Sequence, residues 1–318
     1  MTSSTVSRLI LACALVSACG AANAQLYFTD IFNPDFQTGH IRSVNTDGTN
    51  LQELVDTGGG VRGLDIDRQA GKMYWADVDN LLIRRSNLDG TGIEDLIHLP
   101  GGEEPAFPSA LALDKSHGKL YWGDQTLGTM NRSNLDGSDP EVLFSTPFHR
   151  GLAIDEVNGK IYWDTSISQF KGDVWRSNLD GTGQELVVTS TDERFKPNKI
   201  ALDIAGGKIY WTDYVFDIVR RSNLDGSDIQ NIYVPPFNRN PQGIALDLQN
   251  GVVYWGQDIE IDGNTGKIMA ADLDGSNAHD FMDGFGHVPE VLYSPVPEPV
   301  TLVVLGVGLL ALMKRRGK

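Results

Sequence analysis

Short runs of alternating apolar and polar residues, separated by clusters of Gly, Asn, Asp and Pro, fill the chain between residues 25 and 295. One unit of this pattern reads "KIALDI", "GKIYWTD", "IVRRSNLD" and "QNIYV". Side chains of a strand point alternately to its two faces, so short runs rich in β-branched and aromatic residues predict four strands joined by turns. The region has no apolar pattern with the 3.6-residue period of a helix.

The four-strand unit recurs along the chain. An aromatic pair marks its second strand at intervals of 41 to 48 residues, at Tyr27-Phe28, Tyr74-Trp75, Tyr121-Trp122, Tyr162-Trp163, Tyr210-Trp211 and Tyr254-Trp255. A period of this length with a conspicuous aromatic dipeptide is typical of β-propellers, in which each repeat forms one blade. The sequence therefore predicts an all-β fold, a six-bladed β-propeller with four antiparallel strands per blade.

An Asp-Gly dipeptide follows the third strand of every repeat. It occurs at Asp47-Gly48, Asp89-Gly90, Asp136-Gly137, Asp180-Gly181, Asp225-Gly226 and Asp274-Gly275. Asp-Gly supplies the positive φ angles of a tight hairpin, here between the third and fourth strands. Calcium binding by these acidic turns is the alternative, although no distal Glu completes a calcium loop. We expect no cofactor and no metal, with Ca²⁺ as that alternative.

These repeats resemble the YWTD repeats, also called LDL-receptor class B repeats, which form six-bladed β-propellers. The resemblance covers nearly all of residues 25–294. The repeats begin at a second strand, "LYFTD", and end at an isolated first strand, "PEVLYS", so the last strand would complete the first blade and close the ring. The repeated Trp residues are expected to pack between blades rather than to bind a ligand.

The resemblance also implies a role for the Asp that follows the aromatic pair. In the family pattern this Asp hydrogen-bonds to a neighbouring blade, and the pattern carries over to Asp30, Asp77, Asp124 and Asp213. Thr165 and Gln257 occupy the same slot in blades four and six, which puts the inter-blade bond in doubt there.

The connections that vary in length and chemistry gather on one face of a propeller. They run from the fourth strand to the next first strand and from the second strand to the third; we call this the variable face, and we expect function there because loops carry function on a rigid scaffold. The candidate ligand-binding residues on this face are Arg62, Phe107, Phe148, His149, Arg150, Phe195, Asn198, Phe237, Arg239 and Gln242.

Two interpretations of these residues stay open. Arg beside Phe in an acidic domain suits a carboxylate or a peptide side chain, through charge-assisted hydrogen bonds and stacking. Alternatively, each Phe fills the gap between two blades and each Arg pairs with a nearby acid. Asp65 stands where other blades have Ala, either on the channel wall or paired with Arg62. Asp258, Glu260 and Asp262 form either a solvated strand edge or a cation site.

The N-terminal segment has the features of a signal peptide over residues 1–24. Arg8 precedes the apolar run "LILACALVSA", and Ala22-Asn23-Ala24 is a cleavage signal of the small-x-small kind. The stretch "VSAC" allows a lipoprotein signal as the alternative. Cys13 and Cys19 both lie in this segment. Disulfides, thiol catalysis and cysteine metal sites are therefore excluded in the mature chain.

The C-terminal segment has three parts. A linker at 295–299 contains Pro297, Glu298 and Pro299, an apolar run follows at 300–313, and a basic tail ends the chain at 314–318. We expect residues 300–313 to form a short transmembrane sorting helix, although the run is shorter than the roughly 20 residues of a typical membrane-spanning helix. Basic residues beside such a run mark the cytoplasmic side, so the tail at 314–318 is expected in the cytoplasm. This order resembles the PEP-CTERM proteins. The resemblance implies export in a Gram-negative cell, processing by an exosortase-type enzyme, and release or display at the surface, often with exopolysaccharide.

The charge balance narrows the range of partners. The chain has 26 basic and 42 acidic residues; without Arg8, the four basic residues of the tail and Glu298, 21 and 41 remain, a charge of −20. Nucleic acid and anionic membrane surfaces are poor partners for such a protein. No Gly-x-Ser-x-Gly, His-Glu-x-x-His or phosphate-loop motif is present. We expect a non-enzymatic binding module for a protein or polysaccharide. A channel-based hydrolase or lactonase and an architectural matrix protein are the alternatives.

Overall fold

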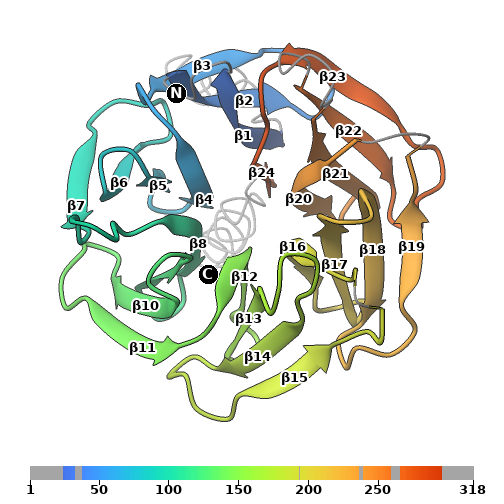
Figure 1. The fold of residues 1–318 in the computed structure, drawn as a ribbon. Coiled ribbons are helices and arrows are strands. Elements are labelled where there is room, and N and C mark those ends of the chain that lie inside the picture. Colours follow the sequence, from blue (N-terminus) through green and yellow to red (C-terminus); the bar gives the residue numbers. More distant parts are fainter. Residues whose placement is uncertain (1–23, 33–37, 193, 236–238, 259–265, 296–318) are drawn as a thin grey trace, which may run out of the picture. The chain divides into compact units, whose positions relative to one another are not determined.

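The described part of the chain forms a ring of six blades around a central channel (Figure 1). In the computed structural model, Gln25–Ser294 is one compact unit whose strands pair into six antiparallel four-stranded sheets. The predicted fold class, a six-bladed β-propeller, is confirmed. No helix long and apolar enough to cross a membrane occurs among the residues described. Those residues are 24–32, 38–192, 194–235, 239–258 and 266–295.

Each blade runs from an innermost strand at the channel to an outermost strand at the rim. The innermost strands are β24 (Val291–Ser294), β4 (Val61–Asp67), β8 (Pro108–Asp114), β12 (Phe148–Asp155), β16 (Pro197–Asp203) and β20 (Pro241–Asp247). The second strands, which carry the aromatic pairs, are β1 (Gln25–Phe32), β5 (Lys72–Asp77), β9 (Lys119–Asp124), β13 (Lys160–Thr165), β17 (Lys208–Asp213) and β21 (Val252–Gln257).

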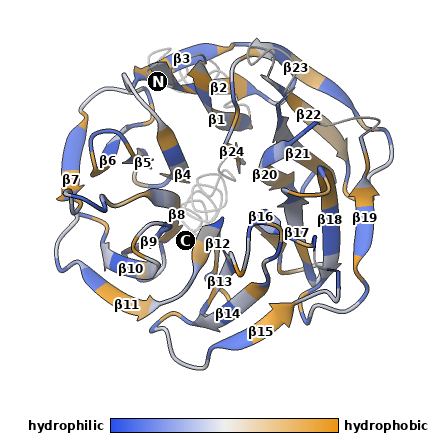
Figure 2. Cartoon of the chain, in the orientation of Figure 1, coloured by the Kyte–Doolittle hydropathy of each residue, from blue (hydrophilic) through white to orange (hydrophobic). Residues whose placement is uncertain are grey.

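The two outer strands complete each blade. The third strands are β2 (Thr38–Asn45), β6 (Leu82–Asn87), β10 (Thr129–Asn134), β14 (Val174–Asn178), β18 (Ile218–Asn223) and β22 (Gly266–Asp272). The outermost strands are β3 (Gln52–Asp56), β7 (Glu94–His98), β11 (Glu141–Ser145), β15 (Glu185–Val188), β19 (Gln230–Tyr233) and β23 (His279–Phe285). Figure 2 shows hydrophilic and hydrophobic positions mixed along these outermost strands, consistent with their partial exposure.

The core consists of apolar clusters between neighbouring blades. The cluster between the first two blades joins Ile41 and Val55 to Leu64, Met73 and Trp75. Five further clusters of the same kind occur in the described residues. Each Trp of the aromatic pairs is at most 4% exposed. The expectation that these rings pack between blades is confirmed, and each blade buries its faces only because it has two neighbours.

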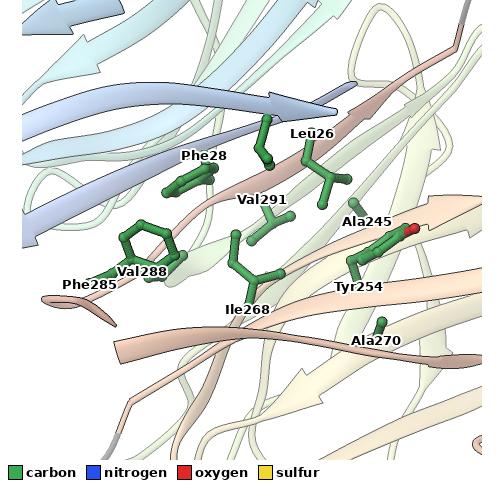
Figure 3. Packing of buried hydrophobic residues seen from close by; sticks show 10 residues of the cluster. Leu26, Phe28, Ala245, Tyr254, Ile268, Ala270, Phe285, Val288 and Val291 are labelled. Carbon is green, nitrogen blue, oxygen red and sulfur yellow. The ribbon is translucent and has the colours of Figure 1, made fainter. Parts of the chain in front are cut away.

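The ring closes where the last strand joins the first blade. β24 pairs with β1 from Gln25↔Ser294 to Phe28↔Val291, as the order of strands in the sequence predicts. Figure 3 shows the cluster that seals this joint, in which the rings of Phe28 and Phe285 meet edge to face at 4.8 Å. Closure gives the first blade its innermost strand, so that each of the six sheets of the described ring has four strands.

The Asp-Gly turns differ in detail from the expected hairpin. In blade five, Gly226 has a φ of +82°, whereas the φ of Asp225 is not positive. The Gly226 amide donates to the Asn223 carbonyl at 2.9 Å, so the loop is a type I turn that ends in a left-handed glycine. A Cβ on Gly226 would lie 1.8 Å from the Val187 carbonyl oxygen of the preceding blade. The glycine therefore allows both the turn and the close approach of two blades.

The innermost strands begin with bulges. In β4, β8, β12, β16 and β20, the register with the second strand shifts within the first few residues. Between Pro197 and Ile200, for example, Asn198 and Lys199 lie opposite the single residue Thr212. A bulge interrupts the alternation of a strand and redirects its side chains. Because these strand starts lie together on the variable face, the bulges decide which side chains reach the channel mouth.

Candidate functional site

A buried ion pair spans the channel at its variable end. Lys199, from β16, is 5% exposed, and Glu290, just before β24, is 8% exposed. The Lys199 ammonium pairs with the Glu290 carboxylate and donates to the Ser109 carbonyl of β8 at 3.1 Å. The Glu290 carboxylate also accepts the Gly63 amide of β4 at 2.8 Å. The pair therefore links the innermost strands of several blades across the channel.

Burial of this pair changes the ionisation of its lysine. Desolvation lowers the pKa of Lys199, and Glu290 opposes that shift. Arg62 and Arg150 lower the pKa of Lys199 further by charge repulsion. The sequence does not point to Lys199, because strict alternation along "NKIALDI" gives no reason to turn this side chain into the channel.

Arg62 is a half-buried cation without a carboxylate at ion-pair distance. Its Nη1 donates to Nε2 of His287 at 3.3 Å. Since a guanidinium only donates, Nε2 accepts and Nδ1 of His287 carries the proton that bonds Asp258. In the described part of the chain, no acid forms a direct ion pair with Arg62. Burial, reinforced by nearby Arg150, lowers the pKa of Arg62 to about 10.

Arg150 is the second cation at the mouth. Its guanidinium lies 5.5 Å from the ring centre of Tyr214, a cation–π distance, and its Nε is buried without a hydrogen-bond partner. The Arg150 backbone is fixed by a hydrogen bond, in which its amide donates to the Asp164 carboxylate at 2.9 Å. As for Arg62, no ion pair with an acid of the described chain is formed. The interpretation in which each Arg pairs with a nearby acid is therefore wrong for these two residues.

Two amide side chains complete the mouth. Asn198 and Gln242 are both at most 1% exposed, and Nδ2 of Asn198 donates to Oε1 of Gln242 at 3.3 Å. Oδ1 of Asn198 is buried without a partner. The structure thus brings Arg62 and Arg150 together with Lys199 at the start of the channel, whereas Asn198 and Gln242 are buried and bond each other.

The aromatic candidates do not form a rim around the mouth. Phe148 and Phe195 are at most 1% exposed. A Cβ on Gly123 of the preceding blade would lie 2.1 Å from the Phe148 ring, and the Phe195 ring lies 6.1 Å from that of Trp211. Their assignment as ligand-binding residues is wrong, because these rings fill gaps between blades. Phe285 is buried in the same way.

The remaining candidates lie elsewhere or outside the described residues. Phe107 is half-buried in the connection before β8, and its amide donates to Asp124 at 3.2 Å. Arg239 is half-buried in the connection before β20. Burial raises the pKa of Tyr233 in blade five, and the positive charge of Arg239 opposes that shift. Phe237 lies outside the described residues, and nothing is described of the His149 side chain.

Asp65 is not paired with Arg62, which corrects one of the two expectations for it. Its carboxylate accepts the amide of Ile66 at 2.6 Å and that of Leu113, in the next blade, at 2.8 Å. Burial raises the pKa of Asp65, although Lys115 and the two amides oppose that shift. Asp65 thus lies on the channel wall, nearer the end opposite the variable face.

The inter-blade role of the repeated Asp residues is visible at Asp30. This carboxylate accepts the amide of Gly286, in the connection from blade six, at 2.8 Å. Asp77, by contrast, bonds Asn80 and Arg84 of its own blade. Asp124 accepts the amide of Phe107, in the connection that precedes its innermost strand. Asp213 instead accepts the amides of Val215 and Phe216 in the turn that follows its own strand. Asp30 and Asp124 therefore fasten the connection that enters their blades.

The two departures from this Asp pattern bond locally. Thr165 accepts the amide of Asp173, and Gln257 accepts the indole N–H of Trp255, in each case within the same blade. The doubt about inter-blade bonds at these positions agrees with the structure.

A metal site is not formed by the described side chains. No group of three or more His, Cys, Asp or Glu among them lies close enough together to hold an ion. Asp258 bonds His287, whereas Glu260 and Asp262 lie outside the described residues. The absence of a cofactor, with Ca²⁺ as the alternative, stays a prediction.

Comparison with known proteins supports the fold. No protein-family model matches the chain. Over 70 residues it is 36% identical to low-density lipoprotein receptor-related protein 1 of Pyricularia oryzae, a match that covers 22% of this chain and 23% of the relative. The solved structure of a nidogen/laminin complex contains a chain that matches at a TM-score of 0.70 and 19% identity, over 85% of this chain and 98% of that one. The chain shares its fold with these propellers.

A second solved structure agrees with this conclusion. TolB from Acinetobacter baumannii matches at a TM-score of 0.68 and 12% identity, over 90% of this chain and 70% of that chain. At such identities the similarity shows the six-bladed β-propeller and does not transfer the residues of the mouth.

The Lys199–Glu290 pair predicts strong energetic coupling. Lys199→Met or Glu290→Gln alone should lower the free energy of unfolding by about 3–5 kcal/mol, because each leaves a buried polar or charged partner unpaired. The double variant should lose much less than the sum of the two. Urea denaturation of the four proteins measures the coupling.

The exposed Arg176–Glu185 pair is the matched control for this cycle, since Glu185 is 51% exposed. Arg176→Met and Glu185→Gln should show a coupling below about 1 kcal/mol. Additive losses at Lys199 and Glu290 would contradict the linking role assigned to their ion pair.

Proposed function

We propose that this propeller is a non-catalytic interaction module that binds an acidic segment of a partner protein on its variable face. Arg62 and Arg150 receive carboxylates of that segment at the channel mouth. The half-buried guanidinium of Arg62, which bonds His287 and has no ion pair within the described residues, carries this proposal. A cation that is partly withdrawn from water without a counter-charge is costly, so a site that keeps one is suited to an anion from outside.

The surface beside Arg150 has the composition of a protein interface. Tyr214, under the Arg150 guanidinium, is 39% exposed, and Ile167 and Phe170 of the next loop are 55% and 50% exposed. Lys196 fixes that loop by donating to the carbonyls of Ser168 and Gln169 at 3.0 and 3.1 Å. Aromatic and Arg side chains are enriched among the residues that contribute most to protein binding. Charge at the mouth and apolar contact beside it therefore favour a protein segment.

The comparisons support a protein partner. The nidogen propeller that this fold matches is one component of a complex with laminin. A neutral polysaccharide would leave the guanidinium charges uncompensated, whereas a carboxylate matches them in charge and geometry.

The carboxylates of the channel favour binding over catalysis. Glu290 is engaged by Lys199 and the Gly63 amide, and Asp65 by two backbone amides. A general base must reach the proton that it removes. Both acids are instead occupied by the protein itself, so we assign them to structure.

Peptide selection tests the proposed function. A displayed library of random dodecapeptides is selected on the purified full chain, with the Arg62→Met/Arg150→Met double variant as counter-target. We expect enriched peptides that combine Asp or Glu with aromatic residues. Their Asn or Gln versions, and the double variant, should bind at least tenfold more weakly, because charge-assisted contacts of a buried guanidinium are lost.

The control is Arg85→Gln. This substitution removes the ion pair between Arg85, on the third strand of blade two, and the exposed Glu94 on the outermost strand, away from the mouth. It should bind the selected peptides within about twofold of wild type, since exposed pairs contribute little. Peptides without carboxylates, or equal binding by the double variant, would contradict the proposal. Binding of polygalacturonate with the same dependence on both arginines, and no acidic peptide, would instead indicate a uronic-acid polysaccharide.

We also propose that the protein is exported and sorted at the cell envelope, on the strength of the two terminal segments. Residues 1–23 and 296–318, including Pro297, Glu298 and Pro299, lie outside the described residues. In the C-terminal segment the Pro-Glu-Pro motif is followed by an apolar run and then by a basic tail. This order supports transient insertion in the inner membrane of a Gram-negative cell, followed by cleavage by an exosortase-type enzyme.

Mass spectrometry of the protein from its own cells tests this part. The mature chain should begin at Gln25 and lack the residues of the apolar run and basic tail. An intact chain from Met1 to Lys318 in the cytoplasmic fraction would contradict export and sorting together.

A further inference from the structure

The central channel contains a cavity of about 260 Å³ below the ion pair at its mouth. Most of the residues that line it are apolar, among them Leu152, Ala153, Ile200, Ala201 and Ala245, but polar groups contribute slightly more of its surface than apolar groups do. Protein interiors are close-packed with few voids larger than a water molecule. A cavity of this size with both apolar and polar wall is therefore a place that a small amphipathic molecule can fill.

Charge differs between the two ends of the cavity. At the variable end, Arg150 and Lys199 face one acid, Glu290, which leaves one excess positive charge. At the opposite end, Lys115 faces two acids, Asp65 and Glu156. An amphipathic anion would therefore direct its charged head toward the variable end and its apolar part along the wall.

Hydrogen-bond donors are available at the positive end. The Lys199 ammonium has three protons, of which the Ser109 carbonyl and Glu290 take two. The Arg150 guanidinium also borders the cavity. A carboxylate placed between these two side chains would accept charge-assisted hydrogen bonds from the ammonium and the guanidinium, in a region where burial strengthens such bonds.

The volume limits the size of the ligand. An apolar cavity of about 150 Å³ holds benzene, which has six heavy atoms, so about 260 Å³ corresponds to about ten heavy atoms. We propose that the central channel binds a small amphipathic monocarboxylate of about this size, with its carboxylate on Arg150 and Lys199 and its apolar part between the alanines of the innermost strands. This site is separate from peptide binding on the variable face, although Arg150 borders both.

The ligand enters from the face that carries the Asp-Gly turns. The Lys199–Glu290 pair spans the variable end. At the opposite end, the side chains of Lys115 and Glu156 are 42% and 28% exposed, and their ion pair is 3.6 Å long. Exposed ion pairs of this kind are weak and break readily. The opposite end is therefore the easier route for a small molecule.

Calorimetric titration of the purified full chain with a homologous series tests the proposal. Butanoate, hexanoate and octanoate should bind one per chain, with affinity rising by about fourfold for each added methylene. Tetradecanoate should gain nothing over octanoate, because the cavity ends. 1-Octanol should bind at least tenfold more weakly than octanoate, since it lacks the charge that Arg150 and Lys199 compensate.

Two variants locate the binding. Ala201→Leu fills the channel and should weaken octanoate binding at least tenfold while leaving binding of acidic peptides unchanged. Arg150→Met should remove the preference for octanoate over 1-octanol and keep 1-octanol binding. Should Ala201→Leu not fold, the chain-length series and Arg150→Met decide the question. Affinity that still rises through tetradecanoate, no saturable binding of octanoate, or full binding by Ala201→Leu would overturn the proposal.

Discussion

Each blade of this protein has two apolar faces that it cannot bury alone, and this constraint determines the rest of the structure. Six copies bury those faces only as a closed ring, so the ring needs a joint, which the pairing of β24 with β1 provides. Closure brings the starts of the innermost strands together around one channel. The functional features follow from that convergence, since no single blade contains a site.

At the point of convergence the structure holds more positive charge than it compensates. Lys199 has Glu290, whereas Arg62 and Arg150 form no direct ion pair within the described residues. Burial and the charge of Arg150 both lower the pKa of Arg62 and of Lys199, so this concentration of cations is costly to folding. Proteins often keep such a cost at sites where it serves binding. The counter-charge for Arg62 and Arg150 is therefore expected from a ligand outside the protein. The Lys199–Glu290 pair holds in place the innermost strands around these two arginines.

The repeat made the fold predictable from the sequence, because the aromatic pairs and the Asp-Gly turns recur with one period. The aromatic rings pack between blades, and the Asp-Gly turns join the third and fourth strands. The site was predictable only in part. Arg62 and Arg150 were placed at the mouth because they stand at the strand starts. Lys199 was missed because a bulge turns it into the channel, and a bulge leaves no clear pattern in one sequence.

Other errors have a similar origin. Phe148 and Phe195 lie in variable connections, yet both rings turn inward to fill gaps that exist only between assembled blades. Asp65 bonds an amide of the next blade, which sequence proximity to Arg62 did not suggest. For Phe148 and Asp65 the partner comes from another blade, tens of residues away, so spacing within one repeat could not identify it.

The most direct measurement compares stability and binding in Arg62→Met. If Arg62 is held buried for a ligand, this variant should keep the free energy of unfolding of wild type or raise it by about 1 kcal/mol, while its binding of selected acidic peptides falls at least tenfold. Destabilisation by more than about 2 kcal/mol with peptide binding intact would contradict the account and make Arg62 a structural residue.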